Sequence, residues 1–258
     1  MLKPREEIPR RLYISLMPFL FIVILVLWSV VTYGGVISPL FLPSPSKVVE
    51  TMISMFKSGG LWGDTWASFY RVSMGFLLAA VLAVPLGLLM GTYKLFEAPV
   101  EPLMGFFRYL PASAFIPLLI LWVGITDMEK ILVIFIGTFF QLTLMIADTI
   151  RRVPMDLLWV SYTLGVDRKS VLYKVLLPAA LPEIVDNLRI AMGWAWTYLV
   201  VAEIVAATTG LGFMIMQSQR FLRTDKIFVG IVIIGLLGII TDQVFKYVHR
   251  ILFPWVHG

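Results

Sequence analysis

The chain has 258 residues, of which 59% are hydrophobic and 14% charged, and its mean hydropathy is +0.90. This composition excludes an ordinary water-soluble domain of that length. The net charge of +5 indicates neither a nucleic-acid partner nor an acidic one, and the lack of cysteine excludes disulfides and thiolate metal sites. The sequence therefore predicts an all-α polytopic membrane protein.

Six apolar stretches approach or exceed the length of about 20 residues that a helix needs to cross a bilayer. The third is broken by Pro111 and Pro117, and if it is re-entrant the number of spans falls to five. The first is too long for the core of a signal peptide and lacks an A-x-A-like cleavage site, so it is predicted to be retained. Residues 1–258 then form a single domain. Its predicted spans are Leu12–Tyr33, Phe69–Gly91, Pro102–Val123, Ile131–Ala147, Ile184–Ala207 and Ile227–Tyr247.

Lysine and arginine are shared unevenly between the two sides that these spans define. With the N-terminus inside, twice as many fall on the inner side as on the outer side. The bias agrees with the positive-inside rule, so both termini and the segment Asp148–Pro182 are predicted to be cytoplasmic.

Asp148–Pro182 is more polar and more punctuated than an ordinary loop between membrane helices. Pro154 suits the first turn of a helix, and apolar residues recur at helical spacing over Met155–Leu164. Gly165 then provides a left-handed C-terminal cap.

A second short helix is expected after this glycine. Asp167 can cap a helix over Arg168–Leu176, which Pro178 and Pro182 should end before the fifth span begins. Two short helices around a glycine form a protruding knuckle, which a partner outside the membrane can bind. The alternative is a connector that lies on the surface and has no partner.

The second span carries a stripe of small residues at every fourth position, a spacing that places them on one face of a helix. Such stripes mark close contact between helix backbones in membranes, so we expect static packing here rather than substrate contact. The alternative is chance in a helix rich in glycine and alanine. The stripe consists of Gly75, Ala79, Ala83, Gly87 and Gly91.

Polar residues within the spans are candidates for a translocation path. Arg189, Gly193, Trp196, Val200 and Glu203 share one stripe of the fifth span, which faces either the pore or a dimer interface. Alternatively, Glu203 is an internal hydrogen-bonding strut in the packing of the helices.

Three other residues are path candidates. Gln141 and Thr143 are neutral and lie in the fourth span, so they suit the polar lining of a path. Arg108 precedes the proline break of the third span and is expected at the inner surface. It either attracts anions to an inward mouth or is an interfacial arginine whose side chain snorkels.

Residues for bond-making chemistry or metal binding are missing from the spans. The chain has no G-x4-GK-[ST] phosphate loop, and His249 and His257 stand in the tail without carboxylates arranged for a metal. An intramembrane enzyme is thereby disfavoured. A stand-alone secondary transporter, the remaining alternative, needs paired acids within the spans and usually internal repeats, and neither is evident.

Gly165, Val175, Leu177 and Pro178 follow the pattern G-x9-hydrophobic-x-L-P. This pattern resembles the cytoplasmic EAA loop of the permeases of ATP-binding-cassette (ABC) importers, which docks into the ATPase subunit. The tripeptide Trp159-Val160-Ser161 stands where that family usually has Glu-Ala-Ala.

The resemblance continues over nearly the whole chain. Five segments resemble, in order, the type I importer permeases of the nitrate, sulfonate, taurine and bicarbonate group. They are Phe41–Met52, Arg108–Ile125, Leu177–Val205, Gly210–Ile215 and Thr224–Asp242.

The resemblance implies a permease subunit that forms an alternating-access path for a small anion. Two identical copies should form this path in the bacterial cytoplasmic (inner) membrane, in contact with lipid, above two ABC ATPase subunits. A substrate-binding protein outside should deliver nitrate, bicarbonate, taurine or an alkanesulfonate. ATP and magnesium would belong to the ATPase, so this chain should hold no cofactor and catalyse no reaction. The residues implied for ATPase coupling are Trp159, Ser161, Leu164, Gly165, Val166, Asp167, Val175, Leu177 and Pro178.

Overall fold

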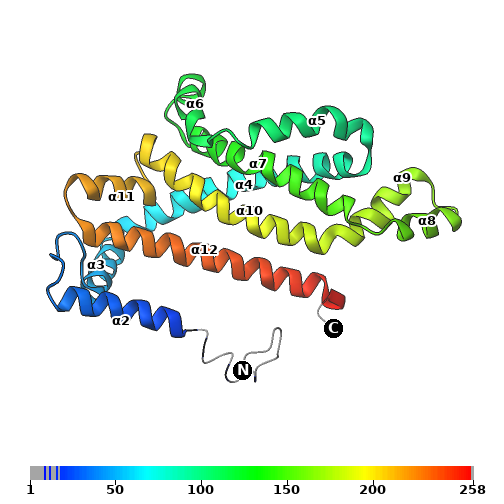
Figure 1. Cartoon of the computed structure of the whole chain (residues 1–258). Helices are drawn as coiled ribbons and strands as arrows, with labels where there is room; N and C mark the ends of the chain where they lie inside the picture. The colour runs from blue at the N-terminus through cyan, green and yellow to red at the C-terminus, as the bar shows by residue number, and fades with distance from the viewer. Residues whose placement is uncertain (1–8, 10–11, 13–15, 17, 257–258) are drawn as a thin grey trace.

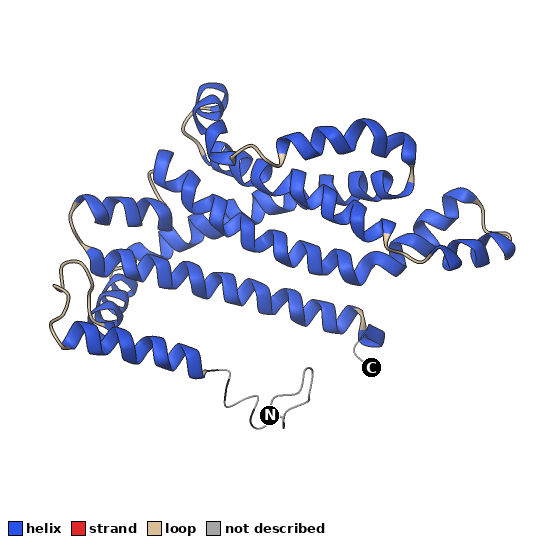
Figure 2. Ribbon diagram, in the orientation of Figure 1, coloured by secondary structure: helices blue, strands red, loops and turns tan. Residues whose placement is uncertain are grey.

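The computed structural model describes residues 9, 12, 16 and 18–256, apart from the side chains of Arg168 and Lys169, and within these residues it is helical without strands (Figures 1 and 2). The α-helices are α2 (Phe19–Tyr33), α3 (Pro45–Lys57), α4 (Gly60–Thr92), α5 (Lys94–Phe107), α6 (Ile116–Val123), α7 (Asp127–Arg151), α8 (Met155–Thr163), α9 (Arg168–Val171), α10 (Leu177–Ala206), α11 (Leu211–Arg220) and α12 (Thr224–Leu252). Short 3₁₀ segments cover Ala112–Phe115 and Pro254–Val256, and a π-helical segment covers Leu172–Leu176.

The centre of the molecule is a bundle of the long apolar helices α4, α7 and α10, with α12 alongside α10 (Figure 1). Its main core includes Val72 of α4, Leu142 of α7 and Leu199 of α10, all with no exposed surface. The short helices α3 and α11 gather at one end of this bundle, and α8 and α9 protrude at the other (Figure 1). We call these the far end and the knuckle end.

Helices α4 and α7 run in the same direction. Gly75 of α4 lies against Ile134 of α7, and Gly91, sixteen residues later, lies against Ile150. Because both helices run towards the knuckle end, the segment between them must return to the far end.

The return is made by α5 and α6, which are bent by 86° at the break after Phe107. This pair is a broken span rather than a re-entrant loop, because its ends lie at opposite ends of the bundle. The predicted boundary at Pro102 was wrong, since α5 begins at Lys94 and Pro102 lies inside it. Pro117 starts α6 rather than breaking a helix, because proline fits the first turn.

Four described helices are long and apolar enough to cross a membrane, and the bent pair makes a fifth crossing. The predicted count of six is therefore not reached within the described residues. The remaining apolar helix, α2, has 15 residues. The predicted first span starts at Leu12, but residues 13–15 and 17 lie outside the described part of the chain.

The fifth predicted span does not start afresh after the knuckle. The chain is helical without interruption from Arg168 through the π-helical segment to Ala206, so Pro178 and Pro182 do not end the second short helix as expected. Pro178 occupies the first turn of α10. The π turn before it already interrupts the usual i to i−4 hydrogen bonds. The N–H that proline lacks therefore costs no helical hydrogen bond at this position.

Candidate functional site

The knuckle, which we define as α8, α9 and the turn between them (residues 155–171), is held in shape by capping hydrogen bonds at the end of α8 and the start of α9. The amide of Gly165 donates to the carbonyl of Tyr162, and that of Val166 donates to Ser161, both at 3.0 Å. This Schellman pattern requires a left-handed residue, and Gly165 has φ +80°. The Asp167 carboxylate then accepts from the amide of Ser170 at 3.1 Å and caps α9.

The predicted coupling residues divide into an exposed set and a buried set. Trp159 is 63% exposed and Leu164 78%, and Gly165, Asp167 and Pro178 are also exposed. Ser161 is only 5% exposed, and its hydroxyl donates to the carbonyl of Leu157. Ser161 therefore points into the protein, and its part in ATPase coupling stays a prediction. The half-buried Val166, Val175 and Leu177 pack against the main core instead.

The base of the knuckle is fixed to the bundle by ion pairs. Arg151 contacts Glu101 of α5 at 3.2 Å, and Arg152 pairs with Glu183 of α10. These contacts join the end of α7, just before the knuckle, to α5 and α10.

Glu203 belongs to a far-end polar cluster, defined as Ser68, Arg71, Asp127 and Glu203. Glu203 has no exposed surface; it accepts from the Ser68 hydroxyl at 2.9 Å and from the Arg71 guanidinium at 2.7 Å. The Arg71 Nε donates to Asp127 at 2.7 Å. Because an unpaired charge at this depth is costly, the cluster ties α4, α7 and α10 together.

Glu203 also fixes the turn that leads into α11. The amide of Gly212 donates to the Glu203 carboxylate at 2.8 Å, and Gly210, at φ +115°, lies directly against that carboxylate. Arg71 donates to the carbonyl of Thr209 at 2.7 Å. Of the two roles considered for Glu203, this geometry matches the internal strut.

Two other path candidates are also buried within the bundle. Thr143 has no exposed surface, and its hydroxyl donates to the carbonyl of Phe139 within the same helix at 2.8 Å. Trp196 is 4% exposed and its indole donates to Thr241 of α12 at 3.3 Å. Neither side chain reaches an open surface of the described chain, and their role in a path stays a prediction.

The small-residue stripe of α4 lies along α7. An added Cβ atom at Gly75, Gly87 or Gly91 would stand 2.7–2.8 Å from atoms of α7, closer than real Cβ atoms approach. Ala79 and Ala83 have no exposed surface. The stripe allows the two parallel helices to pack backbone to backbone.

Arg108 and Gln141 meet in a cavity of about 220 Å³. The cavity lies at the bend between α5 and α6 and is also lined by Gly137 of α7 and by Trp194 and Tyr198 of α10. We call it the mid-depth cavity, because its α7 residues 136–141 surround residue 139, the midpoint of that helix. Arg108 was expected at the inner surface; the structure places it half-way along the bundle.

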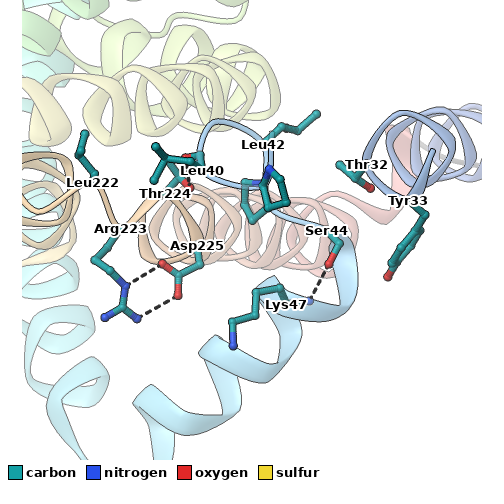
Figure 3. A pocket seen from close by; sticks show the side chains of 12 residues that line it. Thr32, Tyr33, Leu40, Leu42, Ser44, Lys47, Leu222, Arg223, Thr224 and Asp225 are labelled. Atoms are coloured by element: carbon teal, nitrogen blue, oxygen red, sulfur yellow. Dashed lines mark hydrogen bonds and ion pairs between the residues drawn. The ribbon is translucent and has the colours of Figure 1, made fainter. Parts of the chain in front are cut away.

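A larger hollow of about 710 Å³ lies at the far end, between the end of α2, the start of α3 and the start of α12 (Figure 3). Its charged groups are paired within the chain: Arg223 contacts Asp225 at 3.1 Å, and Lys47 contacts Glu50 at 3.1 Å. Asp225 also accepts from the Thr51 hydroxyl at 3.0 Å, which ties α12 to α3. The two ion pairs are local, and the hydrogen bond between Thr51 and Asp225 is the contact among these that joins two elements.

Sequence reasoning missed several residues of these sites. Arg71 was not among the candidate residues, although an arginine within a predicted span signals a buried acidic partner. Trp194 and Tyr198 were not singled out, although their i, i+4 spacing places them on one face of α10. Among the described residues, no group of His, Asp and Glu is arranged to hold a metal ion.

Comparison with known proteins agrees with this geometry. Residues 83–253 match the family model described as "binding-protein-dependent transport system inner membrane component". The chain is 38% identical over 233 residues to the putative aliphatic sulfonates transport permease SsuC of Bacillus subtilis, covering 90% of this chain and 84% of that protein. It is 34% identical to the taurine transport system permease TauC of Escherichia coli, covering 92% and 87% of the two chains.

A more distant relative and a solved structure extend the comparison. The bicarbonate transport system permease CmpB of Synechocystis is 29% identical over 242 residues, covering 89% of this chain and 85% of that protein. The fold resembles a chain of the inward-facing MetNI methionine ABC transporter, with a TM-score of 0.60 and 21% identity over 73% of this chain and 95% of that one. The chain therefore belongs to the family of inner-membrane components of binding-protein-dependent transport systems, the permease subunits of ABC importers.

Proposed function

We propose that this chain is the permease of an importer for a small oxyanion, of the class formed by sulfonates, taurine and bicarbonate. Two identical copies form the path, two ABC ATPases bind the knuckle end, and a binding protein delivers the substrate at the far end. The names of the relatives SsuC, TauC and CmpB support this substrate class. ATP and magnesium are then held by the ATPase.

The observation that carries the proposal is the knuckle itself. It projects beyond the bundle and leaves Trp159 and Leu164 largely exposed, although neither is in a membrane-spanning helix (Figure 1). Large apolar side chains on a protruding, capped turn are typical of a protein contact. An ATPase that buries them would move the knuckle, and the ion pairs at its base would pass that movement to α5 and α10.

The distribution of charge supports a cytoplasmic knuckle end. Arg151, Arg152, Lys174 and Arg250 lie at or near that end, as does the end of α12, so the C-terminus is also assigned to the cytoplasm. At the far end, Arg71 is neutralised by Asp127 and Glu203. The positive-inside rule counts lysine and arginine residues whether or not they are paired, so those at the knuckle end support its assignment to the cytoplasm.

The test replaces Gly165 with leucine. A side chain at φ +80° strains the turn by about 1–2 kcal/mol and alters the angle between α8 and α9. We expect Gly165→Leu to insert into the membrane but to lose most of the co-purifying ATPase and of the substrate-stimulated ATP hydrolysis.

Gly35→Leu is the matched control. Gly35 has φ +71° and, like Gly165, has open space around it, but it lies at the far end. This variant should retain the ATPase. Normal substrate-stimulated hydrolysis in Gly165→Leu would overturn the docking assignment, and purification of the unmodified chain without any ATPase would favour a secondary transporter.

A further inference from the structure

The mid-depth cavity brings together hydrogen-bond donors from three separate segments. Arg108 comes from the bend after α5, Gln141 from α7, and Trp194 and Tyr198 from α10. Gly137 makes room for this arrangement, because the Tyr198 ring lies directly against it. No carboxylate is among the residues that line the cavity.

These donors are largely unused within the described chain. The Arg108 guanidinium donates to the Tyr109 hydroxyl at 2.8 Å and lies 4.8 Å from the centre of that ring. A guanidinium has five N–H donors, so most remain available. The Gln141 amide, the Trp194 indole and the Tyr198 hydroxyl make no hydrogen bond to another described residue.

Arg108 also lacks an acidic partner. Among the described residues no carboxylate lies within ion-pair distance of it, whereas Arg71, Arg151, Arg152 and Arg189 all have one. An uncompensated cation half-way across a bilayer costs several kcal/mol if it faces lipid. Arg108 is exposed in the single chain, so this face must border water or protein rather than lipid.

The size of the cavity limits the ligand. At about 220 Å³ it is smaller than the 300–1,000 Å³ usual for drug-sized ligands, and equals roughly seven water volumes. A cation surrounded by neutral donors suits a compact oxyanion, since each anion oxygen accepts hydrogen bonds from guanidinium, amide, indole or phenol groups.

We propose that the mid-depth cavity is a transient oxyanion-binding site, in which Arg108 supplies the charge and Gln141, Trp194 and Tyr198 supply neutral donors. The permease itself then discriminates for an oxyanion after the binding protein has released it. This site rests on the proposed function for its place in transport, but its binding chemistry can be measured without the ATPase.

The experiment uses the purified chain in lipid nanodiscs and titrates it with sodium methanesulfonate at constant ionic strength, with chloride as the balancing anion. The readout is intrinsic tryptophan fluorescence, since Trp194 lines the cavity. We expect a saturable change. Arg108→Gln should weaken the apparent affinity at least about tenfold, because it removes a charge-assisted hydrogen bond. The apparent affinity of Arg108→Lys should lie between that of the unmodified chain and that of Arg108→Gln.

Two further variants fix the location. Trp194→Phe should abolish the signal, and Arg220→Gln, which removes an exposed arginine on α11, should leave the titration unchanged. A titration without saturation, a signal that survives Trp194→Phe, or equal affinity in Arg108→Gln would each overturn the site. If the chain binds methanesulfonate in this way but never associates with an ATPase, the site stands and the proposed function fails.

Discussion

Single residues in this chain show how a charge is kept inside a membrane helix. Glu203 and Arg71 have 0% and 3% exposed surface, and each is stable there because the other, together with Ser68, Asp127 and backbone groups, satisfies its hydrogen bonds. A network of this kind is valuable mainly because breaking it is costly: the remaining partner becomes an uncompensated charge.

Glu203→Ala is therefore expected to destabilise the chain by roughly 3–5 kcal/mol, as measured by its unfolding transition in detergent. The matched control is Glu50→Ala. Glu50 also pairs with a cation, but its side chain is 70% exposed, so the loss should be about 0–1 kcal/mol. Equal, small effects in both variants would show that Glu203 is not a strut.

Helices are the scale at which the sequence was most informative. Long apolar runs predicted α4, α7, α10 and α12 because a bilayer imposes a length on each. Local chemistry predicted α8 and both caps of the knuckle, since Gly165 and Asp167 act within a few residues of their partners. What sequence reasoning missed depends on distant contacts.

Three examples illustrate this limit. Pro111 and Pro117 indicated a break in the third span but neither its angle of 86° nor the position of Arg108 along the bundle, so Arg108 was expected at the inner surface. Thr143 and Trp196 were expected to line a path, but neither polarity nor helical spacing shows which helix covers a residue, and both are buried. The α4 stripe indicated close packing, but its partner α7 became visible only in the structure.

The packing of α4 on α7 gives a prediction at the scale of helices. Gly87→Leu places a side chain where a Cβ alone would meet Ile146 at 2.8 Å. Overpacking of this kind typically costs 1–3 kcal/mol or more, so the unfolding temperature in detergent should fall.

Gly63→Ala on the same helix is the control. No atom lies within 4 Å of its added Cβ, and alanine is favoured over glycine in a helix by up to about 1 kcal/mol. This variant should be neutral or stabilised. A stable Gly87→Leu protein would mean that α4 and α7 separate easily, contrary to a rigid pair.

At the scale of the whole molecule, the bundle has one wall that does not suit lipid. Arg108 is exposed beside the mid-depth cavity. On α10, next to the cavity residues Trp194 and Tyr198, Gly193 and Thr197 are also exposed, although glycine has no side chain and threonine is polar. By contrast, the exposed residues of α12 at this level are large and apolar apart from Gln243; Ile240, for example, is 56% exposed. The two walls should therefore face water and lipid, respectively.

The absence of native cysteine makes this difference measurable, because a single introduced thiol is the only one in the chain. Thr197 and Ile240 lie at the same depth, since their neighbours Trp196 and Thr241 are hydrogen-bonded. Only a thiol in water ionises and reacts rapidly with a charged methanethiosulfonate reagent. In nanodiscs, Thr197→Cys should thus be labelled much faster than Ile240→Cys. Equal rates would place the α10 wall in lipid or in a dry interface, and the anion path would then have to run elsewhere.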